Sequence, residues 1–234
     1  MARVRGTDPS IRAALAGGAP AFLPVGSAEQ HGAHLGVTTD ADIAQEVSRR
    51  LASVMGGVLL PGIGYGVSRE HAPLFNASLS PAVLRGVVRD VCRSVGSCGA
   101  RAIFVVNGHR GNLDALRRPF AGRGMPEVRV MHYWRHMKEG LGHAGRTETS
   151  LALAAGCRAY MSEARRGLVT EGMDPAEISR LARLASRSFP EAAPGGVWGD
   201  PRGASAARGR ALLAAVTRSM RAECVAVLRG IPNC

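Results

Sequence analysis

The sequence lacks the long apolar segments that place a chain in or across a membrane. No segment reaches the roughly 18 consecutive apolar residues of a membrane span, and the N-terminal MARVRGTDPS has no apolar core of the secretory type. We therefore expect no membrane partner, no signal peptide and a cytoplasmic location.

Cysteine and aromatic residues are also scarce. The five cysteines are odd in number and include no C-x-x-C pair, which argues against a disulfide framework and a zinc ribbon. Aromatic residues make up 4% of the chain, and the net charge of +12 comes almost entirely from scattered arginines. Without a basic block or stacking aromatics, we expect no nucleic-acid partner. The remaining RNA-binding interpretation would require affinity that falls steeply with salt.

The chain has enough apolar material for one substantial core. It has 234 residues, of which 46% are hydrophobic, and glycine and proline are spread along it rather than gathered in a linker. The nearest approach to a hinge is EAAPGG at 191–196. We predict a single domain over residues 1–234.

Apolar runs alternate with helical patterns along most of the chain. This order predicts an α/β fold, a three-layer αβα sandwich with a mostly parallel central sheet, whose ligands bind at the carboxyl ends of the strands. The expected strands are 21–25, 57–61, 101–106 and 127–134, and the expected helices are 42–55, 81–97, 113–120, a segment from Thr147 or Thr149 to Leu153, and 204–228.

Three polar clusters each follow a predicted strand. They are Glu29, His31 and Asp40 after the first strand, Asn107, His109 and Asn112 after the third, and His143 and Glu148 after the fourth. Because loops after parallel strands share one edge of the sheet, these clusters are expected to converge. Imidazoles and carboxylates together are ligands for Zn²⁺, Mn²⁺ or Fe²⁺, and a bridging carboxylate would hold two ions.

Other chemistries find less support in the sequence. There is no G-x-S-x-G elbow, and no cysteine lies beside a cluster. The segment GIGYG at 62–66 has its third glycine misplaced for a dinucleotide loop, so a tight turn is the simpler interpretation.

The clusters lie inside longer motifs: PVGSAEQHGAHL and TTDAD within 24–42, NGHRGN at 107–112, HAGRTETSLAL at 143–153, GYGVSREH at 64–71 and GGVWGDPRGAS at 195–205. In this order and spacing they resemble the motifs of the creatininase family of metal-dependent amidohydrolases. The resemblance implies hydrolysis of a C–N amide bond with two divalent metal ions per subunit, and homo-oligomers that are often hexamers.

The resemblance also implies roles for particular residues. Glu29, His31, Asp40 and His109 correspond to metal ligands, with Asp40 as the bridge between the two ions. His143 corresponds to the catalytic histidine, and we expect it to protonate the leaving nitrogen as a general acid. Glu148 is a further acid near the metals, and a ligand, a base or a partner of a ligand histidine are all open roles for it.

Some positions depart from creatininase itself. Gly111 replaces an acidic ligand, and Glu139 replaces a tryptophan that acts as a lid, so creatinine is a poor candidate substrate. Trp134 matches a second pocket tryptophan, although a core role fits equally well. If two of Arg69, Arg110 and Arg146 reach the pocket, the substrate carries a carboxylate or phosphate.

Two branches of the family suit such an anionic small-molecule or peptide substrate. One comprises the mycofactocin-system peptidases, which trim a precursor peptide at its C-terminus and have similar HAGRTETS and GDP segments. The other comprises deformylases of a formylamino-pyrimidine ribonucleotide. The motifs slightly favour the peptidases. A non-catalytic binding or assembly protein on the same scaffold is the alternative of a different class.

Overall fold

A four-stranded parallel sheet organises the molecule. The structure, a computed structural model, describes residues 6–231. The strands have the spatial order β2-β1-β3-β4, and every neighbouring pair is parallel. The strands are β1 (Ala21–Val25), β2 (Val58–Leu59), β3 (Ala102–Asn107) and β4 (Glu127–His132). The predicted α/β fold is therefore confirmed.

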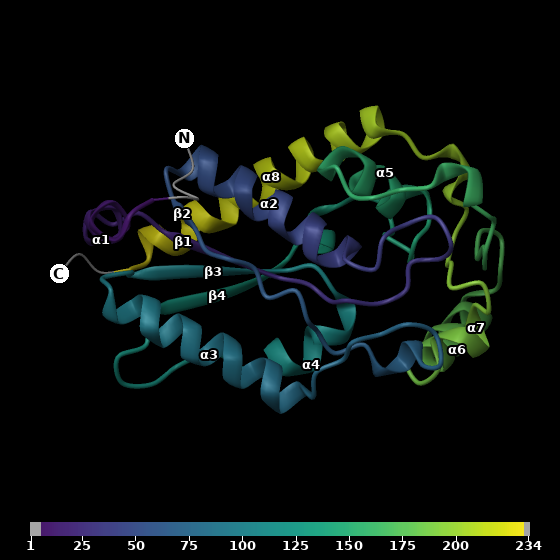
Figure 1. The fold of residues 1–234 in the computed structure, drawn as a ribbon, viewed down its shortest axis with the longest axis horizontal. Helices are drawn as coiled ribbons and strands as arrows, with labels where there is room; N and C mark the ends of the chain where they lie inside the picture. The colour runs from purple at the N-terminus through teal and green to yellow at the C-terminus, as the bar shows by residue number, and fades with distance from the viewer. Residues whose placement is uncertain (1–5, 232–234) are drawn as a thin grey trace.

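Helices cover both faces of this sheet (Figure 1). The helices α2 and α8 lie on one face, together with α5, and α3 and α4 lie on the other. The α-helices are α1 (Asp8–Ala16), α2 (Thr39–Met55), α3 (Pro81–Ser97), α4 (Leu113–Leu116), α5 (Arg146–Ala155), α6 (Pro175–Ala185), α7 (Phe189–Ala192) and α8 (Ala206–Arg229). The result is the expected three-layer arrangement.

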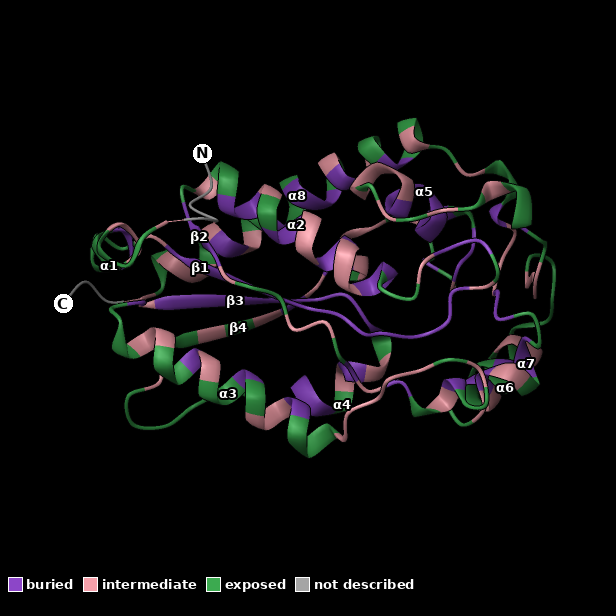
Figure 2. Cartoon of the chain, in the orientation of Figure 1, coloured by how far each residue is buried: buried purple, intermediate pink, exposed green. Residues whose placement is uncertain are grey.

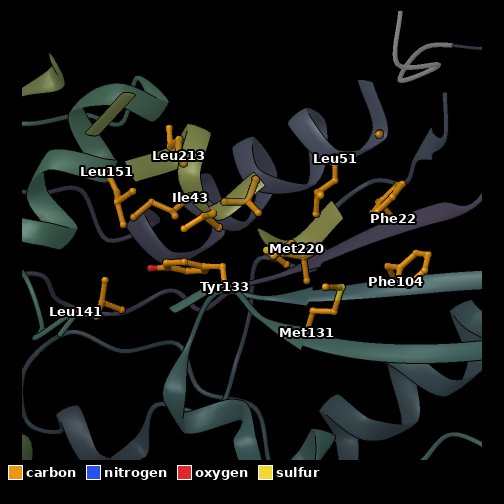
Figure 3. Close-up of a cluster of buried hydrophobic side chains, with 14 of the residues drawn as sticks. Phe22, Ile43, Leu51, Phe104, Met131, Tyr133, Leu141, Leu151, Leu213 and Met220 are labelled. Carbon is orange, nitrogen blue, oxygen red and sulfur yellow. The ribbon is translucent and has the colours of Figure 1, made fainter. Parts of the chain in front are cut away.

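Alternate residues of the two central strands build the two cores. Every residue of β1 and β3 is buried, which Figure 2 shows as continuous purple strands. Phe22 and Phe104 stack with ring centroids 5.4 Å apart and face α2 and α8, in the cluster shown in Figure 3. Leu23 and Val105 point to the opposite core, beside α3. Because successive side chains of a strand point to opposite faces, each central strand contributes side chains to both cores.

Local signals set most of the helix starts. Ser80 and Ser205 each accept a hydrogen bond from a backbone N–H in the first turn of α3 and α8, as an N-cap residue does. Two expected elements are shorter than predicted. The strand at 57–61 is confined to β2, before Pro61, and the helix at 113–120 ends at Leu116.

The shortened α4 has a local explanation. Pro119 disfavours a helical conformation at the preceding residue. The guanidinium of Arg85 then donates to the carbonyls of Ala115, Arg118 and Pro119, so these carbonyls need no helical donors.

The sequence patterns also missed several elements. Helices α1, α6 and α7 were not predicted, and the strand expected to reach Trp134 gives way to a 3₁₀ helix, Tyr133–His136. Among the described residues, no helix is both long and apolar enough to span a bilayer.

The core on the α2 face provides a stability test. Leu51 is fully buried between α2 and the sheet, whereas Val54 on the same helix is 52% exposed. Leu51→Ala should lower the free energy of unfolding by about 2–5 kcal/mol because it leaves a cavity. Val54→Ala should change it by less than about 0.5 kcal/mol. Denaturant unfolding of both variants checks this, and equal effects would contradict the placement of this core.

Candidate metal centre

The loop after β1 carries charged side chains into the interior. Glu29 and His31 are fully buried at the carboxyl edge of the sheet. The ring of His31 is oriented through Nδ1, which donates to the backbone carbonyl of Glu29 at 3.1 Å. Its Nε2 therefore faces the carboxylates of Asp40 and Glu148, at 3.4 and 3.8 Å.

Two glycines bring the first turn of α2 against the ends of β1 and β3. A Cβ on Gly26 would lie 2.3 Å from the Cα of Ala41, and one on Gly108 would lie 2.4 Å from the backbone oxygen of Asp40. No other residue type allows this approach. It places the carboxylate of Asp40 beside His109, with Oδ2 2.9 Å from Nδ1, and the helix N-terminus favours the negative charge there.

The ring of His109 is fixed by its surroundings. Its Nε2 lies 2.8 Å from the backbone carbonyl of Val67 and 3.2 Å from Oε2 of Glu29. Because a carbonyl can only accept, Nε2 carries a hydrogen in either charge state, and Nδ1 presents a lone pair toward Asp40 only when the ring is neutral. The side chain of Asn107 accepts from the backbone N–H of His109 and donates to its carbonyl, which holds the loop after β3 in place.

The third predicted cluster, His143 and Glu148, lies at the start of α5. Glu148 lies in the first turn of α5, where Oε2 accepts from the N–H of Ala144 at 2.5 Å. His143 lies before that helix, with its ring 4.4 Å from that of His31 and Nδ1 3.9 Å from Oε1 of Glu29. The structure thus brings together all six residues predicted as ligands or catalytic groups, namely Glu29, His31, Asp40, His109, His143 and Glu148.

The donor atoms fit a cation. Oε1 and Oε2 of Glu29, Nε2 of His31 and Oδ2 of Asp40 are buried and form no hydrogen bond with the described residues, although oppositely charged groups lie close. Glu29, His31 and Asp40 offer ligand atoms within 4.8 Å of one another, as do His31, His143 and Glu148. Atoms that crowd together without aiming hydrogens at one another are arranged like ligands around a shared ion.

The charged groups of this site strongly affect one another's pKa. Burial alone would lower the pKa of His31 and His109, but the carboxylates of Asp40 and Glu29 outweigh it and raise each pKa to about 10. Burial raises the pKa of Glu148 to about 7, opposed by His31. When no metal is bound, the protons on these histidines therefore supply the positive charge beside the carboxylates.

His143 behaves in the opposite way. Burial and the neighbouring rings of His31 and His71 lower its pKa well below 6.5. The ring is therefore neutral at pH 7 and must gain a proton before it can donate one.

Sequence reasoning missed three residues of the site. His71, in the 3₁₀ helix Arg69–His71, lies 3.1 Å from Oε1 of Glu29 through Nε2, and Gln30 contacts both His71 and His143. Tyr133 is fully buried, and its hydroxyl has no hydrogen-bond partner among the described residues. The motif GYGVSREH could have indicated His71. Tyr133 directly follows β4 and continues its strand-like pattern, so nothing in the sequence marks it as a site residue.

The predicted substrate contacts lie at the periphery. Arg69, Arg110 and Arg146 are exposed, and Arg146 Nε donates to the carbonyl of Gly203 at 3.1 Å. Trp134 is half-buried against the core and the ring of His132. The charge of Arg110 acts on the Tyr133 hydroxyl, whose pKa is raised well above 10 by burial and by the carboxylates of Glu148 and Asp40. Arg110 is thus linked electrostatically to the site, and substrate binding by these residues stays a prediction.

Two departures noted in the sequence now have a structural context. A Cβ at Gly111 would lie 2.0 Å from the backbone oxygen of Val67 and 2.4 Å from Nε2 of His109, so no acidic side chain fits there. Glu139 accepts from Thr147 Oγ1 at 3.0 Å and pairs with Arg208 of α8. These two contacts connect the segment around Glu139 to α5 and α8.

An all-parallel sheet with imidazoles and carboxylates buried at its carboxyl edge is the arrangement expected of a cation-dependent α/β hydrolase. Comparison with known proteins gives the family. Residues 5–224 match the creatininase family, described as creatinine amidohydrolase. The chain therefore belongs to the creatininase family and is a hydrolase that acts on C–N amide bonds.

Individual relatives span most of the chain. The mycofactocin precursor peptide peptidase of Mycobacterium ulcerans is 33% identical over 208 residues, which cover 82% of this chain and 79% of the relative. The creatinine amidohydrolase of Pseudomonas putida is 31% identical over 59% of this chain and 65% of its own. A crystal structure of creatinine amidohydrolase (creatininase) has a TM-score of 0.74 at 26% identity, covering 98% of this chain and 97% of that one.

The contact of Gly111 with His109 predicts a sensitive position. Gly111→Ala should displace the imidazole of His109 and weaken Zn²⁺ binding by roughly 10–100-fold. Gly64→Ala is the matched control, because a Cβ at Gly64 meets nothing within 4 Å. Competitive Zn²⁺ titration of both variants tests this. Unchanged affinity in Gly111→Ala would show that His109 is not held as described.

The raised histidine pKa values predict proton release on metal binding. At pH 8 the metal-free site holds His31 and His109 protonated, since each pKa is about 10, and a metal binds only the neutral ring. Zn²⁺ binding should release up to about two protons, and its affinity should rise with pH until about 10. Calorimetry in two buffers of different ionisation enthalpy measures this. Equal heats in both buffers would contradict it.

Proposed function

We propose that the chain is a dinuclear, divalent-metal-dependent amidohydrolase. The observation that carries this proposal is the position of Asp40, whose two carboxylate oxygens face two different histidines. Oδ1 lies 3.4 Å from Nε2 of His31, and Oδ2 lies 2.9 Å from Nδ1 of His109. One carboxylate between two imidazoles is suited to bridging two ions.

Glu29 and Glu148 complete the proposed ligand set. Glu29 would be a further carboxylate ligand, because its ligand atom lies within 4.8 Å of those of His31 and Asp40. Glu148 would serve the ion on the His31 side, where Oε2 lies 3.8 Å from Nε2. It would thereby supply the negative charge that Gly111 cannot provide. Solved creatininases include a Mn form and one described as Zn-Zn type, and we propose Zn, Fe or Mn for this chain.

The residues around the ions would handle the proton. When bound, two cations lower the pKa of a water molecule and polarise the amide carbonyl. Neutral His143 accepts the proton of the nucleophilic water as a general base, and then delivers it to the leaving nitrogen as a general acid. The general-acid role expected from the sequence is thus the second half of a two-step proton transfer.

We infer a peptide C-terminus as the substrate, by analogy with the mycofactocin precursor peptide peptidases. Arg110 directly follows His109 and is exposed, so we assign it to an anionic group of the substrate. The ion pair of Glu139 with Arg208 argues against a creatinine-type site. No contact within residues 6–231 favours the deformylase or a non-catalytic binding role.

Removal of the proposed bridge tests the metal centre. Asp40→Ala should abolish binding of both ions, whereas Asp42→Ala should not, because Asp42 lies on the same helix but accepts from Thr38 instead. Elemental analysis should find about two transition-metal ions per chain in the unmodified protein and in Asp42→Ala. Peptide hydrolysis should be lost only in Asp40→Ala. Fewer than about one ion per unmodified chain would overturn the dinuclear assignment.

A further inference from the structure

Gln30 lies between two ligand residues in sequence and between two histidines in space. It is buried, and its side-chain Nε2 lies 2.9 Å from Nδ1 of His71 and 3.0 Å from Nε2 of His143. The backbone carbonyl of Gln30 also lies 3.0 Å from Nε2 of His143. One residue therefore contacts two of the rings that approach Glu29.

The orientation of the Gln30 amide follows from a backbone donor. The N–H of Gly32 donates to Oε1 of Gln30 at 2.9 Å, and a backbone N–H cannot act as an acceptor. Oε1 must therefore face Gly32, and the NH₂ group must face the histidines. Gly196 makes room for this arrangement, since a Cβ there would lie 1.9 Å from Oε1.

This amide decides which nitrogen of His71 carries the hydrogen. Nδ1 of His71 accepts from the NH₂ group of Gln30, so the hydrogen of the neutral ring is on Nε2. Nε2 lies 3.1 Å from Oε1 of Glu29, although the two atoms do not form a hydrogen bond in the structure. A ring in this state has no lone pair at Nε2 and cannot bind a metal through it.

His143 is held in the complementary state. The carbonyl of Gln30 has no other donor among the described residues, so Nε2 of His143 carries the hydrogen that satisfies it. Once Nε2 of His143 donates to this carbonyl, it cannot also accept from the Gln30 amide. The short distance between the amide and Nε2 is then a contact without a hydrogen bond. Nδ1 of His143 is left with a lone pair toward the centre, 3.9 Å from Oε1 of Glu29.

A third residue confines both rings. Phe189 of α7 stacks on His71 with centroids 4.7 Å apart and meets His143 edge-on at 4.7 Å. The rings of His71 and His143 are themselves 4.9 Å apart. Neither ring can turn far without displacing Phe189 or the Gln30 amide.

We propose that Gln30 is a positioning residue that fixes His71 as a hydrogen-bond donor and His143 as a proton acceptor at the metal centre. His71 is then not a third histidine ligand, although it lies within ligand distance of Glu29 and His143. Its Nε2–H forms no hydrogen bond with Glu29 in the structure and is therefore available to a substrate oxygen bound beside that carboxylate. The functional part of this inference rests on the proposed metal centre, whereas the hydrogen-bond geometry of Gln30 does not depend on it.

The test uses ¹⁵N-histidine NMR of the metal-free full chain at pH 8. Long-range ring correlations show which nitrogen carries the hydrogen, and the signals are assigned with His71→Gln and His143→Gln. His71 should be in the Nε2–H form. In Gln30→Glu the side chain offers only acceptors, so the ratio of Nε2–H to Nδ1–H in His71 should fall at least about tenfold. Gln30→Met should remove most of the preference, and Gln45→Glu, outside the cluster, should change nothing.

Clear results would overturn the proposal. His71 in the Nδ1–H form, or a ratio unaffected by Gln30→Glu and Gln30→Met, would do so. So would Zn²⁺ addition that shifts Nε2 of His71 as a coordinated nitrogen. Failure of Zn²⁺ to bind at all would contradict the dinuclear centre instead, and it would leave the tautomers of the metal-free chain as an independent result. Backbone spectra of each variant confirm that it is folded.

Discussion

The organising constraint of this structure is the burial of negative charge at one edge of a parallel sheet. Glu29, Asp40 and Glu148 are all nearly inaccessible to solvent, and isolated buried carboxylates are strongly unfavourable. An imidazole lies close to each of them, and the carboxylates raise the pKa of His31 and His109 to about 10. The scaffold must therefore be rigid enough to hold these like charges close together.

That rigidity comes from backbone contacts rather than from the ligands. Gly26 and Gly108 stand just after β1 and β3, and both contact the first turn of α2 closely. The turn is wedged between the ends of the two central strands, which are buried on both faces. The two cores on either side of the sheet thus support Asp40 indirectly, since a shift of α2 in its core would move the proposed bridge.

One sequence signal predicted both the sheet and the meeting of the polar clusters at its edge. A short apolar run followed by a polar loop marks a buried parallel strand and its functional edge, so Glu29, His31 and His109 could be placed together. Sequence reasoning failed where tertiary contacts decide the outcome. The end of α4 depends on Arg85, which is remote in sequence. Likewise, Phe189 lies beside His71 and His143 only because the segment holding α7 folds back over the site, which no periodicity indicates.

The division of roles among the histidines follows from their second ring nitrogen. His31 and His109 donate from one nitrogen to a backbone carbonyl, and the other nitrogen faces a carboxylate. His143 likewise meets a carbonyl, whereas His71 meets the Gln30 amide, which is held by Gly32. When the rings are neutral, His31, His109 and His143 therefore face the proposed centre with a lone pair, and His71 faces it with a hydrogen. The group behind each ring, a backbone carbonyl for three and the Gln30 amide for His71, therefore determines which nitrogen carries the hydrogen in the neutral ring.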